Sequence, residues 1–266
     1  MNLGLEDKVA IVTGASKGIG KAIALELATE GCRWVLSARG EEDVQQAARE
    51  VGEVGDALAL PTDVTKPDEV EKLVKETADR YAKIDILINN AGGIGRAAAF
   101  EELSDEEWFA VLDLNLFSAV RLTRAVLPHM RQQGWGRIIN IASESGIQPD
   151  PFMPHYNASK AALINFTKSL SKAYGEEGIL VNAVSPAFVM MPLVESMLAD
   201  EAEKRGVSAE EAEAAFIEEN RPNIIVRRAG TSGETAAVVA FLASERASFV
   251  AGSNYRVDGG SVASIS

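Results

Sequence analysis

Short apolar segments alternate with longer helical patterns along most of this chain. Residues 8–13 are largely apolar and β-branched, and the next segment places Ile19, Ile23 and Leu27 on one face of a helix. The order then repeats, with strands expected at 33–38, 56–60, 84–88, 136–141, 179–184 and 254–257 and helices at 41–50, 67–82, 105–128, 155–174 and 233–243. Strands that alternate with helices of this length form βαβ units. The sequence therefore predicts an α/β fold with a doubly wound parallel sheet of about seven strands and helices on both faces.

The alternation breaks after the strand expected at 179–184. Residues 191–220 are rich in Met, Ala and Glu and are interpreted as one or two further helices. Because ligands bind at the carboxyl ends of strands in open α/β sheets, an insertion at about 190–225 indicates a substrate lid. A helix pair used for packing or assembly is the alternative. No low-complexity linker divides the chain, so we expect one Rossmann-like catalytic domain over 1–266.

Charge and composition exclude several classes of protein. The chain of 266 residues has 26 Lys and Arg against 39 Asp and Glu, a net charge of −13, which argues against nucleic-acid or anionic-membrane partners. The single Cys32 forms no internal disulfide, and no Cys or His cluster suggests a metal. The N-terminus lacks a signal-peptide pattern, and no apolar run reaches the roughly 18–20 residues that cross a bilayer. We expect a cytoplasmic protein with a small-molecule partner.

Three glycines lie between the first strand and the first helix, at Gly14, Gly18 and Gly20. Glycine permits a tight turn and lets the backbone approach a pyrophosphate that rests on a helix N-terminus. The spacing is G-x-x-x-G-x-G rather than the usual G-x-G-x-x-G of dinucleotide sites. An ordinary strand-to-helix turn is the alternative explanation.

The second strand ends at Ala38 and is followed by Arg39. NAD-binding proteins usually place Asp or Glu at this point to accept from the ribose hydroxyls. A guanidinium there would instead pair with a 2′-phosphate, and Lys17 in the glycine turn adds a second positive charge. Two solvated surface cations are the alternative. The sequence predicts NADP(H) in preference to NAD(H).

A phenol, an ammonium and a hydroxyl are expected near one another in the segment 143–160. Tyr156 and Lys160 are four residues apart and share a helical face, and Ser143 follows the strand expected at 136–141. Such a group is suited to proton transfer. An exposed amphipathic pair is the alternative. The neighbouring His155 points in another direction on a helix, and we expect it at the surface or at the rim of the pocket.

Several motifs occur together in a fixed order: Thr13–Gly20, Asp63–Val64, Asn89–Gly92, Asn115, Ser143 and Tyr156–Lys160. From about Lys8 to Gly260, the chain resembles the short-chain dehydrogenase/reductase family. The resemblance implies a catalytic tetrad of Asn115, Ser143, Tyr156 and Lys160. With Tyr156 and Lys160, it implies cofactor contacts at Gly14, Ser16, Lys17, Gly18, Ile19, Gly20, Asp63, Val64, Asn90, Ala91, Gly92, Pro186 and Val189.

The resemblance also implies a reaction, hydride transfer between NADP(H) and a ketone or secondary alcohol. Alkoxide charge builds on the carbonyl oxygen and needs a proton donor. Lys160, with the positive nicotinamide of the oxidised cofactor, is expected to lower the pKa of Tyr156 from about 10 and to hold the nicotinamide ribose. Ser143 would orient the carbonyl, and Asn115 would hold a water that links Lys160 to solvent. A homotetramer or homodimer that pairs the helices 105–128 and 155–174 is also implied.

The chain departs from the family pattern after the sixth expected strand. Ala187 replaces a glycine, and Met191 stands where a threonine usually holds the nicotinamide carboxamide. Methionine donates no hydrogen bond, so the carboxamide is expected to rely on backbone groups, chiefly of Val189.

The expected substrate pocket is apolar and pliable. Beside Ser143 and Tyr156, its wall is predicted to include Gly93, Ile94, Ile147, Phe152, Met153, Phe188, Met190, Leu193 and Met197. Packing of the lid is the alternative role for several of these side chains. They favour an apolar or aromatic ketone or alcohol over a sugar, while the direction of Arg96 and Arg221, which would suit an acidic substrate, stays open.

Two other functions remain in competition with this carbonyl reductase. Reduction of a 3-oxoacyl thioester on an acyl carrier protein needs a basic docking patch, which the acidic balance does not favour. A non-catalytic dinucleotide sensor or scaffold would not need Ser143, Tyr156 and Lys160 together.

Overall fold

The computed structural model describes residues 2–52 and 56–265. Its centre is a seven-stranded sheet in the order β3-β2-β1-β4-β5-β6-β9, in which every neighbouring pair is parallel. The predicted doubly wound α/β fold is thus confirmed. The strands are β1 (Val9–Thr13), β2 (Arg33–Ala38), β3 (Ala57–Pro61), β4 (Ile86–Asn89), β5 (Gly136–Ile141), β6 (Ile179–Pro186) and β9 (Asn254–Val257).

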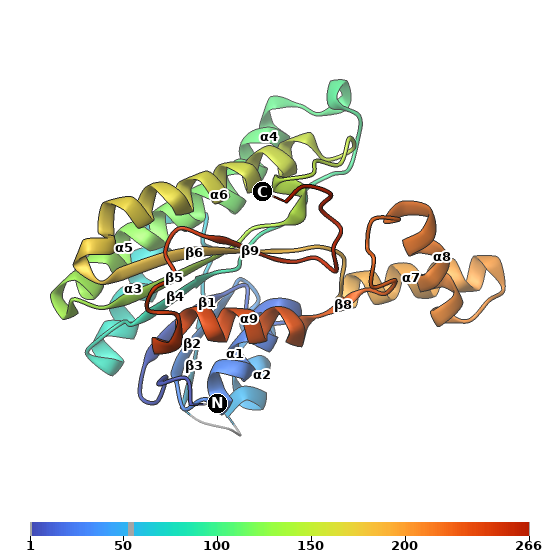
Figure 1. Cartoon of the computed structure of the whole chain (residues 1–266). Helices are drawn as coiled ribbons and strands as arrows, with labels where there is room; N and C mark the ends of the chain where they lie inside the picture. The colour runs from blue at the N-terminus through green and yellow to red at the C-terminus, as the bar shows by residue number, and fades with distance from the viewer. Residues whose placement is uncertain (1, 53–55, 266) are drawn as a thin grey trace.

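Helices cover both faces of the sheet (Figure 1). One face carries α1 (Gly18–Thr29), α2 (Glu41–Gly52) and α9 (Ser232–Ala243), and the other carries α3 (Pro67–Tyr81), α5 (Ser118–Gln133) and α6 (Pro154–Tyr174). Shorter 3₁₀ turns are η1 (Phe100–Glu102), η3 (Glu144–Gly146), η4 (Gly175–Glu177) and η5 (Glu245–Ala247).

Alternation along β1 divides the core into two layers. Ala10 and Val12 pack with α1 and α9, whereas Val9 and Ile11 pack with α3 and α5, and all four side chains are fully buried. Side chains of successive strand residues point to opposite faces, so a strand covered on both sides is apolar throughout. This is why the first apolar run could be identified as a central strand.

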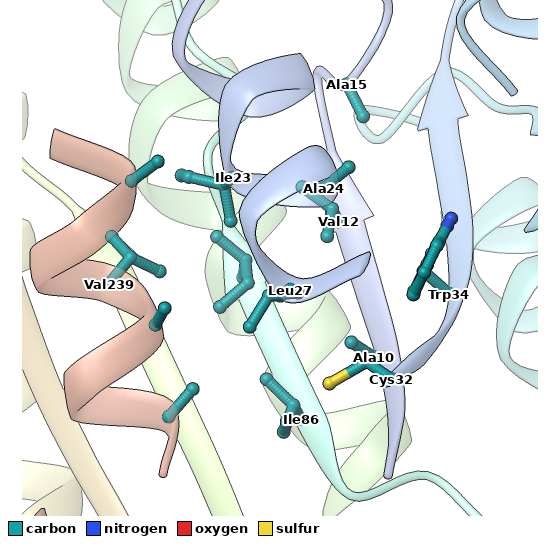
Figure 2. Close-up of a cluster of buried hydrophobic side chains, with 14 of the residues drawn as sticks. Ala10, Val12, Ala15, Ile23, Ala24, Leu27, Cys32, Trp34, Ile86 and Val239 are labelled. Carbon is teal, nitrogen blue, oxygen red and sulfur yellow. The ribbon is translucent and has the colours of Figure 1, made fainter. Parts of the chain in front are cut away.

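The helix α1 is fixed by its buried face (Figure 2). Ile23, Ala24 and Leu27 recur at helical spacing and pack against Val239 of α9 and the sheet. Full burial of each large aliphatic side chain stabilises the fold by about 1.5–3 kcal/mol. The N-terminus of α1, which the glycine turn precedes, is therefore held in place relative to the sheet.

The helix predicted over 105–128 has other bounds. α4 (Asp105–Leu112) passes into a π-helical turn, η2 (Asp113–Phe117), and α5 then continues through Pro128 to Gln133. A proline inside a helix removes one backbone hydrogen bond. Val126 and Met130 on either side of Pro128 are fully buried, and their packing offsets that loss. The end expected at 128 was wrong for this reason.

The segment after β6, predicted to form one or two helices, forms two, together with a small sheet that was not predicted. α7 (Pro192–Arg205) and α8 (Ala209–Asn220) project beyond the carboxyl end of β6 (Figure 1). β7 (Val189–Met190) and β8 (Gly230–Thr231) pair in parallel and join this projection to the rest of the fold. No helix among residues 2–52 and 56–265 is both long and apolar enough to span a membrane.

Candidate active site

The carboxyl ends of β1 and β4 meet where the strand order changes direction, which is the usual ligand site of such sheets. The Thr13 hydroxyl accepts from the backbone N–H groups of Asn90 and Ala91, at 3.0 Å each. The Asn90 side chain donates to the carbonyls of Thr13, at 2.8 Å, and Gly14, at 3.1 Å. These bonds hold the glycine turn beside the segment that follows β4.

The glycines of the turn are required by the backbone. Gly14 and Gly18 have φ of +62° and +56°, in the left-handed region that favours glycine. A Cβ on Gly20 would overlap the carbonyl oxygen of Gly14 and lie 2.5 Å from Nδ2 of Asn90. The turn is thus a cradle of backbone at the N-terminus of α1, where an anion is stabilised by N–H groups.

A cavity of about 460 Å³ extends from this turn to the start of α7. It brings together most of the predicted site. The predicted residues that line it are Gly14, Lys17, Gly18, Ile19, Gly20, Asn90, Ala91, Gly92, Gly93, Ile94, Ser143, Tyr156, Lys160, Pro186, Val189 and Leu193.

The catalytic candidates come from β5 and α6. Ser143 follows β5, is buried, and makes a hydrogen bond with the Tyr156 phenol. Lys160 is 4% exposed, and its ammonium lies 5.7 Å from the centre of the Tyr156 ring. The Lys160 Nζ donates to the carbonyl of Ile141 at 2.7 Å. A hydroxyl, a phenol and an ammonium therefore line one wall of the cavity.

Asn115 lies in the π-helical turn beneath this wall and is 1% exposed. Its Oδ1 accepts from the N–H of Gly93 at 2.9 Å, and its Nδ2 donates to the Gly93 carbonyl at 2.9 Å and to the Ser159 hydroxyl at 3.0 Å. The side-chain amide thus ties the loop after β4 to the catalytic helix. This gives the side-chain amide a positioning role.

Comparisons with known proteins agree with this geometry. A family model described as short chain dehydrogenase matches residues 8–202. The chain belongs to the short-chain dehydrogenase family. It is 38% identical over 261 residues to a 3-oxoacyl-[acyl-carrier-protein] reductase of Synechocystis sp., with 97% of this chain and 98% of the relative covered. It is 35% identical over 256 residues to a D-β-hydroxybutyrate dehydrogenase of Rhizobium meliloti, with 95% and 98% covered.

A solved structure is similar over the whole length. The L-sorbose reductase from Gluconobacter frateurii, complexed with NADPH and L-sorbose, superposes with a TM-score of 0.94 at 35% identity, and each chain is covered to 100%. This chain is therefore a short-chain dehydrogenase family oxidoreductase that acts on carbonyl or alcohol groups.

Burial controls ionisation at the site of this family member. It raises the pKa of Tyr156, although the hydrogen bond with Ser143 acts in the opposite direction, and the nearby Glu144 raises it further. Burial lowers the pKa of Lys160 to about 8. Desolvation of the phenol is thus the largest influence in the protein alone, and the lowering expected with the oxidised nicotinamide bound stays a prediction.

The candidates for the adenosine end lie outside the cavity. Ser16 is half-buried in the glycine turn, Val64 is buried after β3, and Asp63 accepts from the Thr65 hydroxyl at 2.7 Å. Burial would raise the pKa of Asp63, but hydrogen bonds from Thr65 and the charge of Arg39 lower it. Arg39 therefore lies within electrostatic reach of Asp63.

Lys17 and Arg39 are both exposed. Neither side chain makes a salt bridge or hydrogen bond in the part of the chain that the structure describes. Both cations remain available to a ligand.

Six residues of the predicted apolar wall lie elsewhere. Ile147 lines a separate cavity beside α6, and Phe188 stacks on Phe216 of α8 with ring centres 4.9 Å apart. Phe152 is 60% exposed, and Met153 caps the start of α6. The two others, Met190 in β7 and Met197 on α7, also lie outside the cavity lining.

The two arginines whose direction was open are both paired within the protein. Arg96 donates to Glu107 at 2.7 and 3.2 Å and to the carbonyl of Glu102. Arg221, at the end of α8, pairs with Asp150 at 3.4 Å. Neither guanidinium lines the cavity, and each has an acidic partner.

Some residues of the site were missed or misplaced. Ile141, Ala142 and Pro192 also line the cavity. Two of them stand at the carboxyl end of β5 and one opens α7, so the rule that ligands bind at strand ends would have found them. His155, expected at the surface or rim, is completely buried because α4 packs over it.

We expect Gly20→Ala to lower the free energy of unfolding by about 1–3 kcal/mol, because the added Cβ must displace backbone of the turn. Urea unfolding measures the change. Gly175→Ala is the matched control, since an added Cβ there meets nothing within 4 Å, and it should stay within about 0.5 kcal/mol of the parent. Equal midpoints for both variants would contradict the steric argument.

Proposed function

We propose that this protein is an NADP(H)-dependent carbonyl reductase, reversible as an alcohol dehydrogenase, for uncharged and largely apolar ketones and secondary alcohols. The observation that carries the proposal is the convergence of Ser143, Tyr156 and Lys160 on the cavity that also contains the glycine cradle. Geometry of this kind supports proton transfer beside a bound dinucleotide.

The residues fit a dinucleotide cofactor. The tight turn that Gly14 and Gly20 allow presents backbone at the N-terminus of α1, where a pyrophosphate would be bound. Ser16, Gly18 and Ile19 would complete the turn, Asp63 and Val64 would bound the adenine, and Asn90, Ala91, Gly92, Pro186 and Val189 would face the nicotinamide half. When bound, the cofactor supplies the hydride.

Charge supports NADP(H) over NAD(H). Lys17 and Arg39 are free cations near the adenosine end, in a protein of net charge −13. A 2′-phosphate presents oxygens that a guanidinium binds well, whereas the ribose hydroxyls of NAD(H) favour a carboxylate. The NADPH in the similar L-sorbose reductase structure supports the same choice.

The protein's own groups would move the proton. The raised pKa keeps the Tyr156 phenol protonated near neutrality, which suits a donor to a developing alkoxide. Ser143 would orient the carbonyl oxygen, and Lys160, whose pKa of about 8 leaves it mostly charged at pH 7, would stabilise the phenolate left behind. Asn115 would position this group through Gly93 and Ser159.

The substrate end favours a neutral molecule. Ile94, Val189, Met191 and Leu193 supply an apolar wall to the cavity. Arg96 and Arg221 are neutralised by their own partners. A buried carboxylate without a partner costs several kcal/mol, so a charged ketone has no favourable place there.

The pocket wall distinguishes the lead proposal from its alternatives. A 3-oxoacyl thioester on an acidic carrier protein would need a basic docking patch, and Arg96 and Arg221 are each paired with a carboxylate. A sugar, as in the L-sorbose reductase, would leave hydroxyls against apolar side chains. A non-catalytic sensor gives no reason for the convergence of Ser143, Tyr156 and Lys160.

The lid and the assembly remain part of the proposal. Leu193 at the start of α7 lines the cavity, which supports a lid at about 190–225 within one catalytic domain. Phe109 and Phe117 are 68% and 49% exposed on α4 and η2, and such apolar surface supports pairing of these elements in a homotetramer or homodimer. A cytoplasmic location stays a prediction.

Tyr156→Phe should lower kcat by about 10²–10⁴-fold, since it removes the proton donor and leaves the ring in place. NADPH absorbance follows turnover of an accepted ketone, and cofactor fluorescence follows NADPH binding, which should persist. Tyr174→Phe, at the other end of α6, is the matched control and should keep full activity. Retained turnover in Tyr156→Phe would refute the mechanism.

Arg39→Asp should reduce the NADPH-to-NADH ratio of kcat/KM by about 10–100-fold, because a charge-assisted contact of about 1.5–3 kcal/mol becomes a repulsion. Steady-state kinetics with each cofactor measure the ratio. Arg49→Asp, an equally large charge change on the exposed side of α2, should leave the ratio unchanged. If both variants behave alike, the cofactor preference is not set at Arg39.

A panel of ketones tests the substrate end. Methyl acetoacetate should have a kcat/KM at least about 100-fold above that of acetoacetate, because esterification adds one methyl group and removes the carboxylate charge that the pocket leaves unpaired. An aromatic methyl ketone should likewise exceed L-sorbose. NADPH oxidation measures all four rates. Preference for acetoacetate or for L-sorbose would overturn the assignment of a neutral, apolar substrate.

A further inference from the structure

His155, the residue before Tyr156, is completely buried although it is an ionisable group. Its ring lies 5.9 Å from that of Trp108 on α4, tilted by 57°. Among the described residues, neither ring nitrogen has a hydrogen bond of ordinary geometry. The catalytic mechanism gives this imidazole no task, so its position calls for another explanation.

The histidine ring fills the space beside Gly95, in the loop 93–96 that follows β4. A Cβ on Gly95 would lie 2.8 Å from Nε2 of His155 and 2.7 Å from Cγ2 of Val111. Gly95 also has φ of +69°, which favours glycine. The loop backbone is therefore packed directly against the imidazole, with no side chain between them.

Three attachments hold this loop. Gly93 is bound through two backbone hydrogen bonds to Asn115, and Arg96 is bound to Glu107. Between them, Gly95 is held by packing against the histidine. Ile94, which lines the cavity, lies between Gly93 and Gly95. The position of this pocket wall thus depends on the histidine ring.

We propose that His155 is a positioning residue for the substrate pocket: its neutral ring holds the loop 93–96 so that Ile94 forms the wall, and protonation of the ring loosens the loop. The inference rests on the proposed function insofar as Ile94 contacts the substrate. It deepens that function by adding a dependence of substrate binding on pH.

The surroundings of the ring favour its neutral form. Burial is the largest influence and lowers the pKa of His155. Glu107 on α4 and the backbone of Met153 favour the charged form, whereas Arg96 of the loop opposes it. A ring freed by loop opening would have an ordinary pKa near 6.5. The packed loop is therefore most stable above about pH 6.5 and loses stability as the pH falls from there toward the lowered pKa.

The first test is the KM for a neutral ketone between pH 5 and 8, at saturating NADPH so that ionisation of the 2′-phosphate does not intrude. KM of the parent should rise by about three- to tenfold toward pH 5, because protonation of the ring competes with packing of the loop that carries Ile94. His155→Gln reaches the same space without titrating and should keep KM flat. His129→Gln, which removes the other of the two histidines, should keep the rise.

The second test needs no turnover. A protonated imidazole quenches a neighbouring indole, so the parent should show an acid-side loss of tryptophan fluorescence. This transition should disappear in His155→Gln and in Trp108→Phe and persist in His129→Gln. Failure to reduce any ketone would count against the proposed function, while this titration would still report on His155 in its packed position.

Any of three results would overturn the inference. One is a KM that rises in His155→Gln as it does in the parent. Another is a fluorescence transition that survives His155→Gln. The third is a parent whose kcat falls toward pH 5 while its KM stays constant, because a loosened pocket wall weakens substrate binding first.

Discussion

The arrangement of the site depends on hydrogen bonds that join the ends of two central strands. The Thr13 hydroxyl accepts two N–H groups of the segment after β4 and donates to the carbonyl of Ile88 at 3.1 Å, while Asn90 donates back to the turn after β1. Substitution of Thr13 or Asn90 by an apolar residue would leave the polar groups that it binds without a partner. Through this junction, the glycine cradle and the floor of the cavity form one rigid unit.

The same unit continues into the catalytic helix. A Cβ on Gly92 would lie 2.8 Å from Oδ1 of Asn115 and 3.4 Å from Nζ of Lys160, so the loop after β4 passes closely over both side chains. Asn115 in turn donates to Ser159 of α6. Buried polar groups linked in this way specify one arrangement, because each depends on its neighbours for a partner. The π-helical turn places the Asn115 amide between these two elements.

Local patterns of the sequence were sufficient for the sheet, because a strand buried on both faces is apolar whatever lies above it. Local patterns did not predict the end of a helix or the position of a side chain where contacts with residues distant in the sequence determine it. Pro128 signals a helix end locally, but the packing of Val126 and Met130 continues the helix. Phe188 follows the end of a strand, where pocket residues are expected, but its ring stacks on Phe216 of α8 and does not line the cavity. The two-residue strands β7 and β8 are too short to carry any pattern.

The structure separates the cations that have acidic partners from those that have none, which the net charge alone does not reveal. With a net charge of −13, an unpaired cation is uncommon enough to be informative, and Lys17 and Arg39 make no salt bridge or hydrogen bond among the described residues. Arg96 and Arg221, which lie outside the cavity lining, are paired with Glu107 and Asp150. A ligand with its negative charge at one end and a neutral carbonyl at the other matches this division. Tyr156, whose pKa is raised by burial, adds a neutral proton donor beside the Lys160 ammonium, so the wall that would face the ketone can donate a proton and stabilise the charge left behind.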